Sequence, residues 1–506
     1  MSIDSVDGGF NAMIWEGLEA ALLPPFFSEE ENFVKDVTEI FYRFIQFALF
    51  LPCAVISSLA RFTARSFQQN PEGFAAVAQC SELWEAIHIQ EVMLSPLRGA
   101  ASSEYQYSGM ENCPNNQWAE WERENLPMEQ QSGVACDLWN RPEAFVQILK
   151  NLGMNTFRFS VEWSKIEPQE GVFDEDALNH YLYFCKLLKE AGIEPMVTLH
   201  HFTDPLWFTH LGGFEKEENI GLFVEFSKVV FNKLSSYVHL WCTINEPGIV
   251  AFSGYVMGHF PPNQIGSGLS AEVLKNLLKA HCETYRALKP LHEEAQIGLV
   301  HQALRFVPYH TWNPLEVLAA DYLTRMTHGV VMEFLSSGIF HYQMPFFANV
   351  SFEEKEITQL NDFIGVNCYA RPLLAQVFGW NILESSHYPH EAMTQMEFRE
   401  DPAAIYEALR EMHEKTGKPL FVTEVGISTE DEEQYQRYML RALYAIAEAM
   451  KEGVDVQGIY VWSLMKNFEW NLGWGHNFGL CDQEGHLREG AQSLPLFYTQ
   501  TTFEVV

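Results

Sequence analysis

The sequence predicts an α/β fold, a (β/α)8 TIM barrel over residues 91–506 with a mainly helical N-terminal extension over residues 1–90. Three observations lead to this fold class. Eight short apolar runs follow one another from about residue 95 onward. Amphipathic helical segments separate most of these runs, as in a closed barrel of parallel strands. The 506 residues suffice for one large domain and an extension.

The predicted strands are runs of consecutive apolar residues, which is typical of strands buried on both faces. FIGVN and LFVTE are the clearest examples. In chain order, the predicted strands cover residues 96–102, 155–161, 194–200, 240–246, 296–301, 362–367, 419–424 and 457–463.

The predicted helices between the strands have apolar residues at helical spacing. The segment 142–153 ends at a glycine suited to a C-terminal cap. The stripe of Leu, Tyr and Phe along residues 178–192 is typical of a helix face that packs on a core. Further helices are predicted at 218–234 and 432–453.

Polar side chains occur where seven of the eight predicted strands end. In parallel barrels this end of the strands carries the active site, so these side chains are expected to share one cavity. Along the chain they are Gln106, Arg158, His200 and His201, Asn245 and Glu246, Asn367 and Tyr369, Glu424, and Trp462.

Glu246 and Glu424 end the fourth and the seventh strand and are expected to face each other across the barrel mouth. Two carboxyl groups that face one substrate can act as acid and nucleophile in glycoside hydrolysis. One must then be protonated, through burial and its anionic neighbour, and the other ionised. Arg158 and Tyr369 are candidates to hold the ionised group by charge and hydrogen bond.

Several ordered segments resemble glycoside hydrolase family 1, the β-glucosidase-like family, from about residue 95 to about residue 500. The resemblance does not extend to residues 1–90. The segments that carry it are GAASSEYQYSG (99–109), NNQWAEWE (115–122), NTFRFSVEWSKIEP (155–168), TLHHFTDPLWF (198–208), TINEP (243–247), FVTEVG (421–426) and WSLMKNFEW (462–470).

The resemblance implies a retaining β-glycosidase that forms a covalent glycosyl-enzyme and uses neither a metal nor a cofactor. It assigns Glu246 as acid/base and Glu424 as nucleophile, with Arg158 and Tyr369 supporting Glu424. The side chains it assigns to substrate binding are Gln106, His201, Asn245, Asn367, Trp462, Glu469 and Trp470.

Three positions depart from the family pattern: Cys368, Val425 and Lys466 stand where the family usually has Tyr, Asn and Asp. These departures bear on which sugar and which leaving group fit. The retained Glu469 would repel a phosphate on the 6-position of the sugar, which disfavours 6-phospho-glycosides, although Lys466 is close to it in sequence.

Composition limits the partners. The formal net charge of −35 argues against nucleic acid, and a small-molecule or oligosaccharide β-glycoside is expected instead. Nine scattered cysteines and an acidic start predict a cytoplasmic protein with reduced thiols and no standard signal peptide. The apolar stretch 41–62 raises the possibility of membrane contact. The oligomeric state is left open.

Two other functions stay open on the sequence alone. A transglycosylase would use the same two glutamates to move the sugar to an alcohol or a lipid acceptor, because water and acceptor compete for one intermediate. The other function is that of a catalytically silent sugar-binding protein, and the presence of both glutamates argues against this hypothesis.

Overall fold

The computed structural model describes residues 96–311, 313–344, 348–375, 384–386, 392–492 and 494. The predicted helical extension of residues 1–90, with its apolar stretch 41–62, lies outside the described residues. Within the described part of the chain, no helix has the length and apolarity needed to cross a membrane. The seven cysteines in this part are all buried and form no disulfide.

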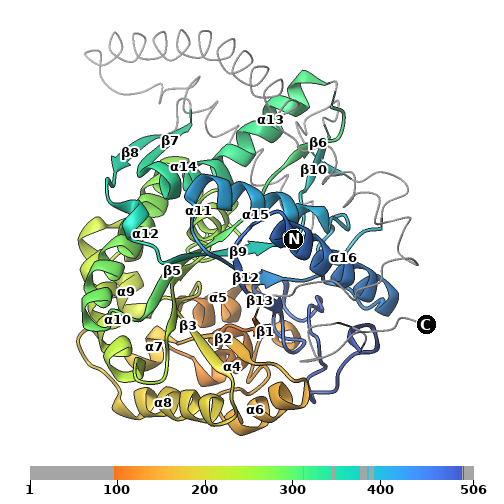
Figure 1. Ribbon diagram of the computed structural model, residues 1–506. Helices are drawn as coiled ribbons and strands as arrows, with labels where there is room; N and C mark the ends of the chain where they lie inside the picture. Colours follow the sequence, from red (N-terminus) through yellow and green to blue (C-terminus); the bar gives the residue numbers. More distant parts are fainter. Residues whose placement is uncertain are drawn as a thin grey trace, which may run out of the picture.

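Eight parallel strands close into a barrel in the order β1-β13-β12-β9-β5-β4-β3-β2 (Figure 1). The (β/α)8 prediction is therefore confirmed, and each predicted strand agrees with an observed one to within one residue at either end. The strands are β1 (Leu97–Ala101), β2 (Thr156–Ser160), β3 (Glu194–His200), β4 (Leu240–Asn245), β5 (Gln296–Gln302), β9 (Phe363–Cys368), β12 (Leu420–Val425) and β13 (Val456–Trp462).

Helices cover the outside of the barrel (Figure 1). A π-helical turn, Arg325–Gly329, joins α13 to α14. The α-helices are α4 (Glu104–Asn112), α5 (Gln117–Asn125), α6 (Pro142–Asn151), α7 (Trp163–Ile166), α8 (Glu175–Glu190), α9 (Leu206–His210), α10 (Ile220–Leu234), α11 (Pro247–Tyr255), α12 (Ser267–Leu288), α13 (Pro314–Thr324), α14 (Val330–Ser337), α15 (Ala403–Thr416) and α16 (Glu432–Lys451).

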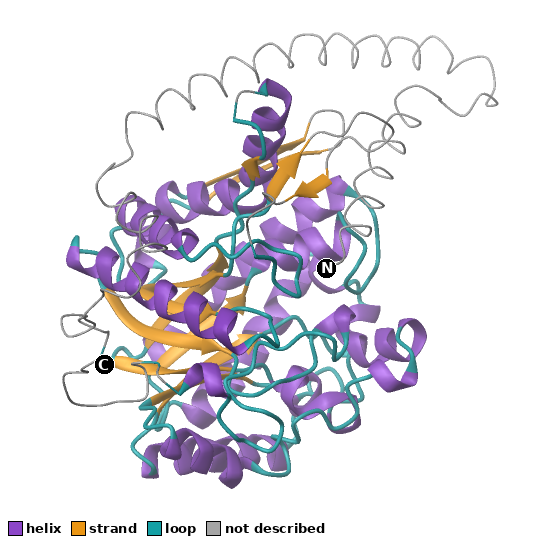
Figure 2. Cartoon of the chain, turned by 90° about the vertical axis from the view of Figure 1, so that its right-hand side faces the viewer, coloured by secondary structure: helices purple, strands orange, loops and turns teal. Residues whose placement is uncertain are grey.

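Two small sheets interrupt the simple alternation after β5, and the apolar pattern did not predict them. A three-stranded sheet consists of β6 (Val307–Pro308), β10 (Leu373–Ala375) and β11 (Glu384–Ser386). It packs beside α13, where Figure 2 shows it at one end of the molecule. A hairpin consists of β7 (Ile339–Met344) and β8 (Ala348–Glu353).

Alternation along the strands directs side chains to two separate cores. Phe157 and Phe159 of β2 belong to the outer core between strands and helices, and Phe159 packs edge-to-face on Phe184 of α8 with ring centroids 4.9 Å apart. Arg158, between them, therefore points into the barrel. The residues of the barrel interior include Met196, Val300, Phe363, Phe421 and Tyr460.

Candidate active site

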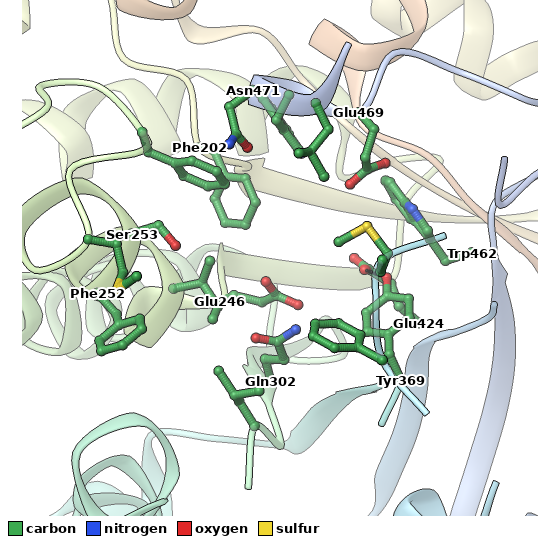
Figure 3. A pocket seen from close by; sticks show the side chains of 18 of the residues that line it. Phe202, Glu246, Phe252, Ser253, Gln302, Tyr369, Glu424, Trp462, Glu469 and Asn471 are labelled. Carbon is green, nitrogen blue, oxygen red and sulfur yellow. Dashed lines mark hydrogen bonds between the residues drawn. The ribbon is translucent and has the colours of Figure 1, made fainter. Parts of the chain in front are cut away.

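A cleft opens at the carboxyl ends of the barrel strands, and we call it the strand-end cleft (Figure 3). Its open volume is about 1570 Å³, including the part that faces solvent. Eight of the predicted site residues line it: His201, Asn245, Glu246, Tyr369, Glu424, Trp462, Glu469 and Trp470. The other three, Gln106, Arg158 and Asn367, are fully buried behind these residues and hydrogen-bond to them.

Glu424, on β12, is held by a cation and a phenol. Arg158 Nη1 donates to its Oε1 at 2.6 Å, and Tyr369 Oη donates to its Oε2 at 2.5 Å. Arg158 also donates through Nη2 to Asn245 Oδ1 at 2.7 Å and through Nε to Thr198 at 3.1 Å. Both oxygens of Glu424 thus accept a hydrogen bond, and a full positive charge lies against one of them.

Glu246 follows β4 and is held by a neutral amide. Asn367 Nδ2 donates to Glu246 Oε1 at 2.6 Å, and Thr423 in turn donates to Asn367 Oδ1 at 2.7 Å. Glu246 also lies between β4 and α11, at φ 46° and ψ 60°, with Pro247 as the first helical residue. A left-handed backbone at a residue other than glycine stores strain, which proteins retain mainly at functional sites.

The same kind of backbone recurs around the cleft. Among the described residues other than glycine, seven have a positive φ, and four of these line the strand-end cleft. The four are Phe202, Glu246, Glu397 and Trp470. This concentration indicates that the surrounding packing holds the lining in a fixed shape.

The hydrogen-bond partners of Glu246 and Glu424 give the two carboxyl groups different pKa values. Burial, followed by the negative charge of Glu424, raises the pKa of Glu246 well above its usual range. Burial also raises the pKa of Glu424, but Arg158 and Tyr369 oppose the rise. Because only Glu424 has a cation within hydrogen-bond distance, Glu246 is the carboxyl group that keeps its proton to higher pH.

Glu469 and Gln106 form a second polar group on the same side of the cleft. Gln106 Nε2 donates to Glu469 Oε2 at 3.2 Å and to the carbonyl of Phe468 at 2.8 Å. Burial, and then the charge of Glu424, raises the pKa of Glu469 to about 8. This group can accept and donate hydrogen bonds to a polar ligand placed against Glu424.

Aromatic rings form the walls of this region. The His201 ring is nearly parallel to those of Trp462 and Trp470, with centroids 5.9 and 6.3 Å away. His201 Nε2 lies 3.2 Å from Asn245 Nδ2. The neighbouring His200 points away from the cleft, because it packs edge-to-face on Phe214 and bonds Asp204 at 3.1 Å.

The three departures from the family pattern lie outside the cleft lining. Val425 and Cys368 belong to the outer core. Lys466 forms an ion pair with Glu430 at 2.6 Å, on a partly exposed surface. Lys466 therefore offers no charge that would compensate Glu469 within the cleft.

The structure also adds lining residues that the sequence reasoning missed. Gln302, at the end of β5, lies beside Glu246 (Figure 3), and its buried Oε1 accepts no hydrogen bond within the described structure. The strand-end rule could have found it, because it follows the predicted fifth strand directly. A second set is apolar and comes from beyond the strands: Ile249, Phe252, Met257, Leu304, Phe306 and Leu323.

Among the described residues, no group of three or more acidic, histidine or cysteine side chains close enough to share a metal ion lines the strand-end cleft. Within the described chain, the carboxylate and imidazole groups close enough to share an ion are Asp482, Glu484 and His486. All three are exposed and none lines the strand-end cleft, and His486 is already hydrogen-bonded to Asp482.

A (β/α)8 barrel with two glutamates of contrasting partners in one strand-end cleft is the arrangement of a glycoside hydrolase. The model of the glycosyl hydrolase family 1 matches residues 96–493, which is well over half of the chain. The chain belongs to this family, and it is a glycoside hydrolase.

Individual proteins with similar sequences or structures support the assignment to this family. Beta-glucosidase A of Acetivibrio thermocellus is 29% identical over 419 residues, which cover 76% of this chain and 91% of the relative. The solved β-glycosidase from Pyrococcus horikoshii superposes with a TM-score of 0.71 at 31% identity, covering 80% of this chain and 94% of that chain. The chloroplastic galactolipid galactosyltransferase of Arabidopsis thaliana is 26% identical over 363 residues, covering 68% of this chain and 53% of the relative.

Proposed function

We propose that this protein is a retaining β-glycosidase that hydrolyses β-glucosides or related β-glycosides. The observation that carries the proposal is the contrast between two glutamates in one cleft. Glu424 lies against Arg158 and Tyr369, and Glu246 lies against the neutral amide of Asn367. The name β-glucosidase on a relative that covers most of the chain supports a glucoside as substrate.

In the first step, Glu424 attacks the anomeric carbon and the glycosidic C–O bond breaks. Glu246 gives its proton to the leaving oxygen, so the alcohol departs neutral and the sugar stays bonded to Glu424. In the second step, water attacks the same carbon, Glu246 takes its proton, and Glu424 leaves as a carboxylate. Two inversions at one carbon retain the β-configuration.

The remaining polar residues bind the sugar. Asn245 is oriented by Arg158 at 2.7 Å, which directs its amide to the hydroxyl beside the anomeric carbon. His201 and Glu469 bind the other hydroxyl groups, and Gln106 holds Glu469 from behind at 3.2 Å. Asn367 lies behind the same subsite and holds Glu246 at 2.6 Å, and Trp462 and Trp470 provide apolar faces for the sugar ring.

A 2-deoxy-2-fluoro-β-glucoside with an activated leaving group tests the proposal. It should inactivate the protein by trapping the glycosyl-enzyme, and peptide mapping should place the label on Glu424. Hydrolysis of nitrophenyl β-glycosides should be observed in parallel. An absence of turnover across a panel of nitrophenyl sugars would favour a catalytically silent sugar-binding protein instead.

Transglycosylation is the second candidate. It is favoured by the apolar part of the cleft, which would bind an apolar alcohol more strongly than it binds water. The relative named galactolipid galactosyltransferase also favours it. Product analysis with an added alcohol separates the two candidates. Free sugar as the sole product would exclude transfer, whereas transfer that dominates at millimolar alcohol would overturn the hydrolase assignment.

A further inference from the structure

One end of the strand-end cleft is lined by aliphatic and aromatic side chains. We call it the apolar end and define it by Ile249, Phe252, Met257, Leu304, Phe306 and Leu323. Phe252 lies on the far side of Glu246 from Glu424, Trp462 and Glu469 (Figure 3). The apolar end is thus where a group attached to the anomeric oxygen would extend, because Glu246 protonates that oxygen.

Three segments distant in sequence form the apolar end. Ile249, Phe252 and Met257 come from α11 and the residues just after it, Leu304 and Phe306 follow β5, and Leu323 belongs to α13. The π-helical turn Arg325–Gly329 joins them: the Thr327 hydroxyl donates to the carbonyls of Leu304 at 2.8 Å and of Leu323 at 2.9 Å. The Thr327 carbonyl oxygen would lie 3.1 Å from a Cβ placed on Gly248, so the turn packs closely against the start of α11.

The lining of the cleft contains no Lys or Arg among the residues that the structure describes. Two nearby arginines are engaged elsewhere, since Arg371 pairs with Asp401 at 2.7 Å and with Glu407 at 2.6 Å, and Arg305 pairs with Glu407 at 3.4 Å. A carboxylate or phosphate on the leaving group would lose its water here and gain no cation, which is costly.

A second sugar ring fits this end poorly as well. Beside the six side chains that define the apolar end, Ser253 next to Phe252 offers one hydroxyl (Figure 3), so most hydroxyls of a second ring would lose water without a partner. An alkyl chain has no such requirement and gains about 0.8 kcal/mol for each buried methylene.

We propose that the apolar end binds an uncharged aliphatic chain, so that the preferred substrates are β-glycosides of long-chain alcohols. This rests on the proposed glycosidase function and adds the class of the leaving group. The chain lies between α11 and the segment after β5.

The test measures kcat/KM for ethyl, butyl, hexyl and octyl β-glycosides of the sugar that a nitrophenyl panel favours, with cellobiose for comparison. We expect kcat/KM to rise about two- to fourfold for each added methylene. Octyl and ethyl glycosides that differ less than threefold, or a preference for cellobiose over octyl glucoside, would overturn the inference. In that case hydrolysis of the nitrophenyl glycosides would leave the proposed function standing, whereas no hydrolysis of any glycoside would remove both.

Substitutions test whether the dependence of kcat/KM on chain length arises at the apolar end. Leu304→Gln, after β5, and Phe252→Gln, in α11, should each lower the octyl-to-ethyl ratio of kcat/KM at least tenfold. Leu291→Gln is the matched control, because Leu291 is 48% exposed and does not line the cleft. Its ratio should equal that of the wild type. An unchanged ratio in both cleft variants would place the chain elsewhere and overturn the inference.

Discussion

Arg158 and Glu424 form an ion pair with 2.6 Å between Nη1 and Oε1, and the Arg158 side chain is completely buried. The guanidinium also donates to Asn245 and to Thr198, so its position is fixed by three barrel strands. Glu246 has the amide of Asn367 in the corresponding place. The protein therefore separates the protonation of two nearby glutamates by giving one a cation and the other a neutral donor.

The first prediction concerns Tyr369→Phe. Tyr369 donates to Glu424 Oε2 at 2.5 Å, and this hydrogen bond opposes the pKa rise that burial causes in Glu424. Its loss should raise the pKa of Glu424. Because Glu424 must be ionised to attack, the acidic limb of the kcat/KM profile should move to higher pH, by about 1–2 pH units for a hydrogen bond to a charged group.

Tyr183→Phe provides the control for that shift. Tyr183 is exposed and donates to Glu143 at 2.6 Å, so the substitution removes a comparable hydrogen bond far from the cleft. The pH profile of this variant should match the wild type. If Tyr369→Phe moved only the basic limb, the assignment of Glu424 as the ionised carboxylate would be wrong.

The second prediction separates the two roles by anomeric outcome. In Glu424→Ala, azide should occupy the vacated space and attack a nitrophenyl β-glucoside directly, giving the α-glycosyl azide. In Glu246→Ala, Glu424 still forms the glycosyl-enzyme, and azide then attacks that intermediate to give the β-glycosyl azide. Without azide, Glu424→Ala should lose at least about 10³-fold in kcat. Nuclear magnetic resonance of the products distinguishes the anomers, and the opposite pairing would exchange the two roles.

Much of this arrangement can be predicted from the sequence for a physical reason. Strands buried on both faces have to be continuously apolar, so the runs FIGVN and LFVTE can be recognised in the sequence as buried strands. The polar residues that end such strands share one rim of the barrel. Arg158 illustrates this, since its apolar neighbours face the helices and leave its guanidinium pointing into the barrel.

The apolar end could not be predicted in the same way. Leu304 and Phe306 lie in a connection with neither the period of a strand nor that of a helix. Their place in the cleft depends on Thr327, which is more than twenty residues away in sequence and joins their segment to α11. Such long-range contacts leave no local pattern, and so the leaving-group half of the cleft emerges only from the structure.

The third prediction concerns the sugar's 6-position. Glu469 lines the cleft, and Lys466 is paired with Glu430 outside it. A 6-phosphate would therefore meet the buried Glu469 carboxyl group and lose its hydration without gaining a compensating cation. We expect kcat/KM for nitrophenyl 6-phospho-β-glucoside to be at least about 10²-fold below that of the unphosphorylated glucoside. Comparable values for the two substrates would mean that Glu469 lies away from the 6-position.

The last prediction concerns the stability that the folded protein loses when the buried carboxyl group of Glu469 ionises. Its carboxyl pKa is raised from 4.5 to about 8 in the folded protein, chiefly by burial. A carboxyl group with a raised folded pKa contributes stability below pH 4.5 that is lost progressively as the pH rises to 8. Glu469→Gln does not titrate, so its free energy of unfolding, measured by chemical denaturation, should exceed that of the wild type increasingly between pH 5 and pH 9. The difference should reach on the order of a few kcal/mol at the alkaline end, while activity falls. The control is Glu218→Gln, on an exposed turn, whose free energy of unfolding should show no such trend relative to the wild type. If the stability gained by Glu469→Gln did not grow with pH, Glu469 would already be ionised in the folded protein.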